Sequence, residues 1–172
     1  MWLRLMLALA LAACVSGCLS IQPTQPPIPD EPARSLPFKG RLAEGERDEL
    51  PPMVAASLSD DSPVTFSYRE ELGHEHHTVP LWISAFNPLT YFGAPTGSTA
   101  VTAFAQLAIR RGETILADYA AQARVSADYG LTYGTTNLDL DRAALAEVRR
   151  KIDDDLARDS VRLAQRNAAS SR

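Results

Sequence analysis

The chain of 172 residues has no cysteine beyond residue 18, because its two cysteines are Cys14 and Cys18. A domain built from the rest of the chain therefore has no disulfide and no catalytic thiol, which excludes thiol peptidases and thioredoxin-like enzymes. Basic residues are also scarce, 17 against 21 acidic ones. Binding to nucleic acid needs a basic face, so we expect no nucleic-acid partner.

Motifs that carry enzyme chemistry are missing as well. The chain has no Gly-x-Ser-x-Gly elbow and no His-Glu-x-x-His pair. Residues 93–97 place two glycines before an expected helix, but they lack the lysine of a phosphate-binding loop. We therefore expect a protein that is not an enzyme and has no cofactor.

The N-terminus has the pattern of a secretory signal: Arg4, a short apolar run over residues 5–13, and small residues before a cysteine. The apolar run of roughly ten residues is too short to cross a bilayer, which takes about 20. The segment Val15-Ser16-Gly17-Cys18 resembles the lipobox of bacterial lipoproteins, and Leu11-Ala12-Ala13-Cys14 is a rival.

The lipoprotein resemblance implies that the Cys18 thiol receives a diacylglyceryl group and that its new amino group is acylated after cleavage. Acyl chains would then hold the protein on a membrane that it does not span. Leu19 follows the cysteine instead of Asp, which in that family implies sorting to the outer membrane. The predicted location is the cell envelope, with the chain anchored in the outer membrane and facing the periplasm.

The predicted organisation has four parts: a signal peptide over 1–17, an acylated cysteine and flexible tether over 18–52, a domain over 53–165, and a disordered tail over 166–172. The tether is predicted from its prolines, which favour an extended, polyproline-like spacer. These are Pro23, Pro26, Pro27, Pro29, Pro32, Pro37, Pro51 and Pro52.

The domain is predicted to be α+β, with an antiparallel or mixed sheet of about three strands and two helices on one face. Alternation of apolar and polar residues predicts a strand over 64–69 and a long strand over 115–133, where every odd position is apolar. Residues 79–85 are predicted to form the third strand, after a polar loop over 70–78. Apolar spacing and end signals predict helices over 98–111 and 137–163.

All three histidines lie together, as His74, His76 and His77, beside several carboxylates. Imidazole is a common ligand of Zn, Cu and Ni. The predicted alternatives are a polar loop with incidental histidines and a periplasmic metal site. A catalytic metal is disfavoured because the histidines lack helical i,i+4 spacing.

Four aromatic residues, Trp82, Phe86, Tyr91 and Phe92, surround Asn87-Pro88. They are predicted either to form core or to make an apolar loop that contacts a partner protein or the membrane.

Taken together, these features predict a membrane-anchored lipoprotein that acts as a non-enzymatic binding or assembly factor, with a protein partner or a second copy of itself. The alternatives are a metal-binding protein using the three histidines and a subunit of an oligomeric outer-membrane assembly joined through the 115–133 strand.

Overall fold

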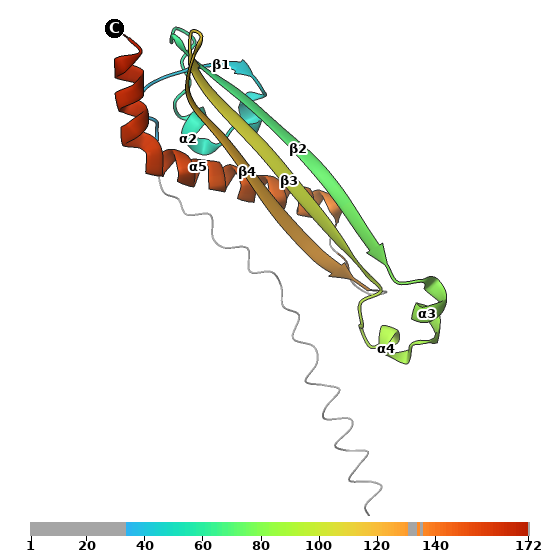
Figure 1. Cartoon of the computed structure of the whole chain (residues 1–172). Helices are drawn as coiled ribbons and strands as arrows, with labels where there is room; N and C mark the ends of the chain where they lie inside the picture. Colours follow the sequence, from blue (N-terminus) through green and yellow to red (C-terminus); the bar gives the residue numbers. More distant parts are fainter. Residues whose placement is uncertain (1–33, 131–133, 135, 172) are drawn as a thin grey trace, which may run out of the picture. The chain divides into compact units, whose positions relative to one another are not determined.

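The structure, a computed structural model, describes residues 34–130, 134 and 136–171. One four-stranded sheet has the order β1-β2-β3-β4, where β1 lies parallel to β2 and the other pairs are antiparallel (Figure 1). The strands are β1 (Arg41–Glu44), β2 (Val64–Thr78), β3 (Gly97–Arg111) and β4 (Thr114–Tyr129). The helices are α2 (Pro52–Ala55), α3 (Leu81–Phe86), α4 (Pro88–Tyr91) and α5 (Asn137–Ala169), with a 3-10 turn at Arg47–Glu49. The predicted α+β class and mixed sheet are confirmed, with one strand more than expected.

Strands β2, β3 and β4 pair along their whole lengths. The register of β2 on β3 runs from Val64 opposite Arg111 to Thr78 opposite Gly97. Fifteen residues in each strand give a ladder about 50 Å long at roughly 3.3 Å per residue. The hairpin between β3 and β4 turns at Gly112, whose φ of 56° lies in the left-handed region that favours glycine. Because β1 pairs only with residues 65–67 of β2, it covers one end of this ladder.

Helix α5 covers one face of the sheet by packing on β3 and β4. It begins at Thr136, whose hydroxyl accepts a hydrogen bond from the Asp139 N–H at 3.3 Å. Its buried residues recur every four or seven positions and form one apolar stripe: Leu140, Ala144, Val148, Ile152, Leu156 and Leu163. The predicted helix over 137–163 is confirmed. The predicted disordered tail is wrong for the described residues 166–171, because α5 continues to Ala169 and Arg166 donates to the Leu116 carbonyl at 2.8 Å.

The helix predicted over 98–111 is wrong, because these residues form β3, the strand paired on both sides. Its odd positions are buried under α5, among them Val101, Leu107 and Ile109. The helical face was predicted from Ala100, Val101, Phe104, Ala105 and Ala108. In the strand these residues alternate between the two faces, and the small Ala103 and Ala105 are buried on the face that α5 covers. Cross-strand pairing on both edges outweighs the intrinsic helix preference of alanine. The long strand predicted over 115–133 is confirmed as β4 up to Tyr129, and residues 131–133 lie outside the described residues.

Two further predictions between residues 70 and 85 are wrong. The polar loop expected over 70–78 is the second half of β2, whose polar side chains reflect an exposed strand and not a break in the ladder. The strand expected over 79–85 is instead α3, which starts directly after Pro80. Proline lacks the N–H that a ladder requires and has the φ that suits a helix start.

The tether predicted over 18–52 extends too far into the chain, because residues 34–52 belong to the fold. Leu36 and Leu50 are buried in the core, and the Leu36 N–H donates to the Ser57 hydroxyl at 2.7 Å. The described members of the core cluster lie between residues 36 and 163, and residues 32–172 form a compact unit with a core of its own. The signal peptide, Cys14 and Cys18 lie outside the described residues.

Candidate functional site

A small helical segment joins the far ends of β2 and β3, at the opposite end of the ladder from β1 (Figure 1). We call residues 79–96, which contain α3 and α4, the tip. Two backbone hydrogen bonds close its base: the Val79 N–H donates to the Thr96 carbonyl at 2.9 Å, and the Thr96 N–H donates to the Tyr129 carbonyl at 2.8 Å. The tip therefore continues directly from the last paired residues of the sheet.

Prolines and one asparagine define the tip locally. Pro80 precedes α3, and Pro88 is the first residue of α4, positions where a missing N–H costs nothing. Asn87 ends α3 and caps α4, since its side-chain oxygen accepts from the Leu89 N–H at 3.1 Å. Gly93, with φ of 93°, follows α4 and turns the chain back toward β3.

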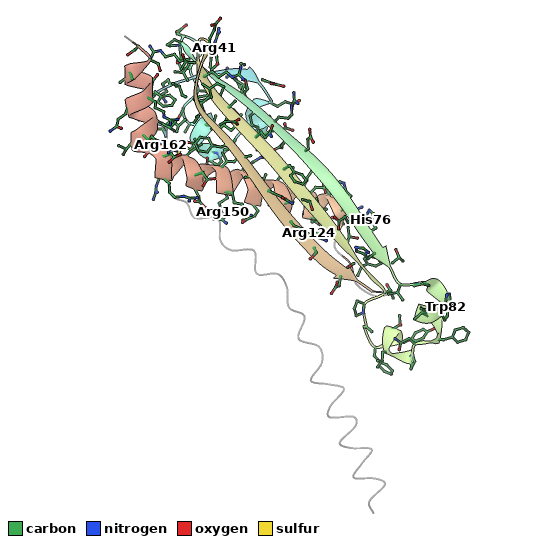
Figure 2. All side chains as sticks on the ribbon, in the orientation of Figure 1. Arg41, His76, Trp82, Arg124, Arg150 and Arg162 are labelled. Carbon is green, nitrogen blue, oxygen red and sulfur yellow. The ribbon has the colours of Figure 1, made fainter. Side chains whose placement is uncertain are left out.

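Large apolar side chains of the tip face solvent. Phe86 is 86% exposed, Phe92 79% and Trp82 68%, and Figure 2 shows Trp82 on the tip beyond the end of the sheet. Of the twelve exposed large hydrophobic residues in the described part of the chain, seven lie here: Val79, Trp82, Ile83, Phe86, Leu89, Tyr91 and Phe92. Exposed apolar side chains gathered in this way mark a contact surface.

Two polar side chains of the tip are engaged within the tip itself. Thr90 is only 3% exposed, although it lies among exposed aromatic residues, and Asn87 uses its side chain in the cap. Thr90 is thus buried while large apolar side chains around it are exposed, the opposite of the usual placement in a globular protein. No charged residue or histidine occurs between residues 78 and 109, which include the tip and most of β3.

The four aromatic residues predicted to bind a partner all lie on the tip and are exposed. The alternative that they form core is wrong for the described domain. Sequence reasoning missed Ile83 and Leu89, which share this surface. The signal that could have found them is Pro80 and Pro88, because prolines on both sides of a short apolar run argue against a buried strand.

Comparison with protein-family models finds no match for this chain, and no curated protein is similar to it in sequence. The function is therefore inferred from the residues and their geometry alone.

The three predicted metal ligands lie on β2 but do not converge. The alternation of a strand places His74 and His76 on the face toward α5 and His77 on the opposite face. His74 Nε2 lies 2.8 Å from Asp141 Oδ1 on α5, and His76 Nδ1 lies 3.2 Å from the Thr99 hydroxyl.

An open pocket of about 510 Å³ at the base of the tip includes His76, His77 and Asp128 in its wall. Nowhere in residues 34–130 or 136–171 do three or more His, Cys, Asp or Glu side chains form a group that could hold a metal ion. Metal binding by the histidines stays a prediction that this geometry does not favour.

A buried polar cluster links β2 to α5. Arg149 contacts both carboxylate oxygens of Glu70, and the Tyr68 hydroxyl donates to Glu70 Oε2 at 2.9 Å. Burial, together with the Glu70 carboxylate, raises the pKa of Tyr68 above its ordinary value. Tyr68 and Glu70 lie on β2 and Arg149 lies on α5, so these hydrogen bonds attach the helix to the sheet.

Two other polar contacts also attach α5 to its neighbours. The Tyr119 hydroxyl donates to Asp159 at 3.1 Å, and burial together with this carboxylate raises the Tyr119 pKa to about 12. Asp153 accepts from the Met53 N–H of α2 at 3.2 Å. Burial raises the Asp153 pKa to about 6 despite that hydrogen bond. These contacts position α5 and α2, and they lie on the part of the sheet away from the tip.

Strand β4, predicted as the joining strand of an oligomeric assembly, is the last strand of the sheet. Side chains of α5 cover part of its edge: Lys151 donates to the Gln122 carbonyl at 2.7 Å, and Arg166 donates to the Leu116 carbonyl. Such contacts occupy backbone acceptors that another strand would need. Assembly through this strand stays a prediction, and the exposed tip is the stronger candidate site.

Proposed function

We propose that this protein is a lipid-anchored lipoprotein of the bacterial outer membrane that acts in the periplasm as a non-enzymatic binding or assembly factor. The lipobox-like segment ending at Cys18 supports the anchor, and Leu19 supports sorting to the outer membrane. The observation that carries the binding role is the tip, whose exposed surface is apolar and free of charge. The contact surface of the factor is accordingly the tip.

The anchor is tested by metabolic labelling with an alkyne-bearing fatty acid in a bacterial host. We expect the wild-type chain and Cys14→Ser to be labelled and to fractionate with the outer membrane. Cys18→Ser should lose the label and remain uncleaved. Because the two cysteines lie four residues apart, each variant is the control for the other. Labelling that depends on Cys14 would move the anchor to the rival site, and labelling of neither form would refute the lipoprotein assignment.

The binding role is tested with a photoreactive amino acid introduced at Phe86 in living cells. Val161, an exposed apolar residue of α5, provides the matched control position. Illumination should yield a defined adduct from position 86 and none from position 161. Equal reaction at both positions would show that contact at the tip is not specific, and reaction at neither would show no contact there; either result would refute the proposed role.

A further inference from the structure

We propose that the tip inserts into the headgroup–acyl boundary of a lipid bilayer, as a second membrane contact separate from the N-terminal acyl chains. The inference deepens the proposed function, and it rests on the tip being the contact surface. It names the chemistry of the partner: a zwitterionic lipid surface, recognised through apolar and aromatic side chains.

The first argument is the composition of the exposed surface of the tip. A protein interface has an apolar centre surrounded by polar and charged residues that remain in water. Among the side chains described on the tip, large apolar ones are exposed on both α3 and α4, and the polar Thr90 is buried. A surface that is apolar in this way suits a medium that can surround it, which a bilayer does and a folded partner does not.

The second argument is the kind of residue and the lack of charge. Trp and Tyr are enriched where proteins meet the membrane–water boundary, and the tip exposes Trp82 and Tyr91 beside phenylalanines. It contains no Lys, Arg, Asp or Glu that would have to leave water. The pocket at its base adds Asp128 and two histidines but no Lys or Arg, so attraction to anionic lipid is not expected.

The third argument is the backbone. Polar backbone groups that enter hydrocarbon must be paired within the protein. Pro80, Pro88 and Pro95 have no amide hydrogen to pair. Tip residues whose N–H groups donate to carbonyls of the tip itself are Val79, Ile83, Asn87, Thr90, Phe92, Gly93 and Ala94, while Leu89 donates to the Asn87 side chain. Most of the N–H groups of the tip are therefore already paired within the tip, so they need not lose hydrogen bonds on entering the bilayer.

The depth to which the tip can insert is limited by the ionisable residues at its base, where the paired strands begin. Interfacial helices bury their apolar face by about 5–10 Å, which matches two short helices above a base whose next residues include His77 and Asp128. The paired strands would remain in water, and α3 and α4 would lie in the interface.

The test uses a chain of residues 19–172, which contains the whole described domain and no lipid anchor. The protein has two tryptophans, Trp2 and Trp82, so Trp82 is the sole tryptophan of this chain and lies within the proposed contact. On addition of phosphatidylcholine vesicles we expect its emission to shift to shorter wavelength and to be quenched by brominated phosphatidylcholine. The chain should also float with the vesicles in a density gradient.

Matched variants separate insertion from adventitious binding. Phe86→Ser combined with Phe92→Ser should weaken vesicle partition at least tenfold, an order-of-magnitude expectation for removing two exposed phenyl rings. Val161→Ser, which removes an apolar residue of α5 that is 69% exposed, should leave partition unchanged. High salt, or the addition of anionic lipid, should change partition little because no basic side chain takes part. Quenching of Trp82 in the wild-type chain needs no variant and holds even if the double substitution impairs folding.

Several outcomes would overturn the inference. Unchanged Trp82 emission with vesicles is one, and binding that requires anionic lipid or is unaffected by the Phe86 and Phe92 substitutions is another. If the chain instead self-associates through the tip in sedimentation experiments, the occupant is a second copy. If vesicles fail but position 86 crosslinks to a protein in cells, the lipid inference falls while the proposed binding role stands.

Discussion

The guanidinium of Arg149 holds both carboxylate oxygens of Glu70, with Nη2 2.5 Å from Oε1 and Nε 3.2 Å from Oε2. The Glu70 side chain is only 9% exposed, so removal of Arg149 would leave an almost buried carboxylate without its counter-charge. We expect Arg149→Ala to lower the free energy of unfolding by about 2–4 kcal/mol, measured by urea denaturation.

The matched control for that substitution is its neighbour Arg150. Arg150 pairs with Glu147 and Asp154 on the solvent face of α5, and its side chain is 60% exposed. Surface pairs of this kind contribute about 0–1 kcal/mol, so Arg150→Ala should cost less than about 1 kcal/mol. Equal losses for the two variants would contradict a structural role for the Glu70–Arg149 pair.

The raised pKa of Asp153 predicts an unusual pH dependence. Its carboxyl has a pKa of about 6 in the fold against 3.8 as the ordinary value. Between these pH values the folded state holds a proton that the unfolded state has released, so the contribution of this group to stability falls as pH rises from about 4 to about 6. Most carboxylates in ion pairs do the opposite.

Asp153→Asn removes this titration and keeps an oxygen that can accept from the Met53 N–H. We expect the variant to be more stable than wild type at pH 7, by about 1 kcal/mol once solvent screening of a partly exposed group is allowed for. The difference should vanish near pH 4. Thermal melts across this range provide the measurement, with the exposed Asp154→Asn as control. A difference that is constant with pH would contradict the assignment to Asp153.

Gly97, at the base of the tip, is predicted to be intolerant of alanine, whereas Gly73 should accept it. Both lie in paired strands. A Cβ at Gly97 would meet the Tyr129 ring and would lie 2.6 Å from the His77 carbonyl oxygen, which is backbone and cannot rotate away. At Gly73 the nearest atom, the Thr102 carbonyl oxygen, is 3.9 Å away.

We expect Gly97→Ala to cost about 1–3 kcal/mol, while Gly73→Ala stays within about 1 kcal/mol of wild type. Chemical denaturation of the two variants side by side gives the comparison. If both tolerate alanine equally, the close contact of Gly97 with Tyr129 and His77 is not a constraint on the fold.

Trp82 is expected to contribute little to stability. Its side chain is largely exposed, so Trp82→Ala should change the free energy of unfolding by no more than about 0.5 kcal/mol. Leu156→Ala, which removes a fully buried side chain from under the sheet, should cost about 2–5 kcal/mol. A large loss of stability in Trp82→Ala, seen as a lower melting temperature, would show that the tip aromatics belong to the core.

The elements that were predicted well are those in which a single periodicity of apolar residues dominates the sequence. Strand β4 alternates from Ala117 to Tyr129, after a register shift that exposes Ile115 and buries Leu116. Helix α5 places Val148, Ile152 and Leu156 on one stripe. In both segments the local period and the final burial agree. In β3 local preference and final structure conflict, because its alanines favour a helix by intrinsic propensity. The pairing of β3 with β2 on one side and β4 on the other decided the outcome, and that information is not local to residues 97–111.

The candidate site was predicted in part. Its aromatic residues were recognised, but whether they face inward or outward depends on what the rest of the chain brings against them. Among the described elements, β1 pairs with the other end of β2, and α5 packs on β3 and β4, so the tip aromatics stay exposed. The histidines were predicted in a loop, whereas the pairing of His74 with Val101 and of His76 with Thr99 places them in a strand, which separates His77 from the other two.

The short parallel pairing of β1 with β2 has a mechanical consequence. The chain enters the fold next to β1, and the tip lies at the opposite end of the ladder. A force applied between these two ends therefore runs along the strands and loads the cross-strand hydrogen bonds in shear. β1 pairs with only three residues of β2, so it would detach before the three long strands. We therefore expect the three long strands to resist such a force together, and the short β1 to be the strand that separates first.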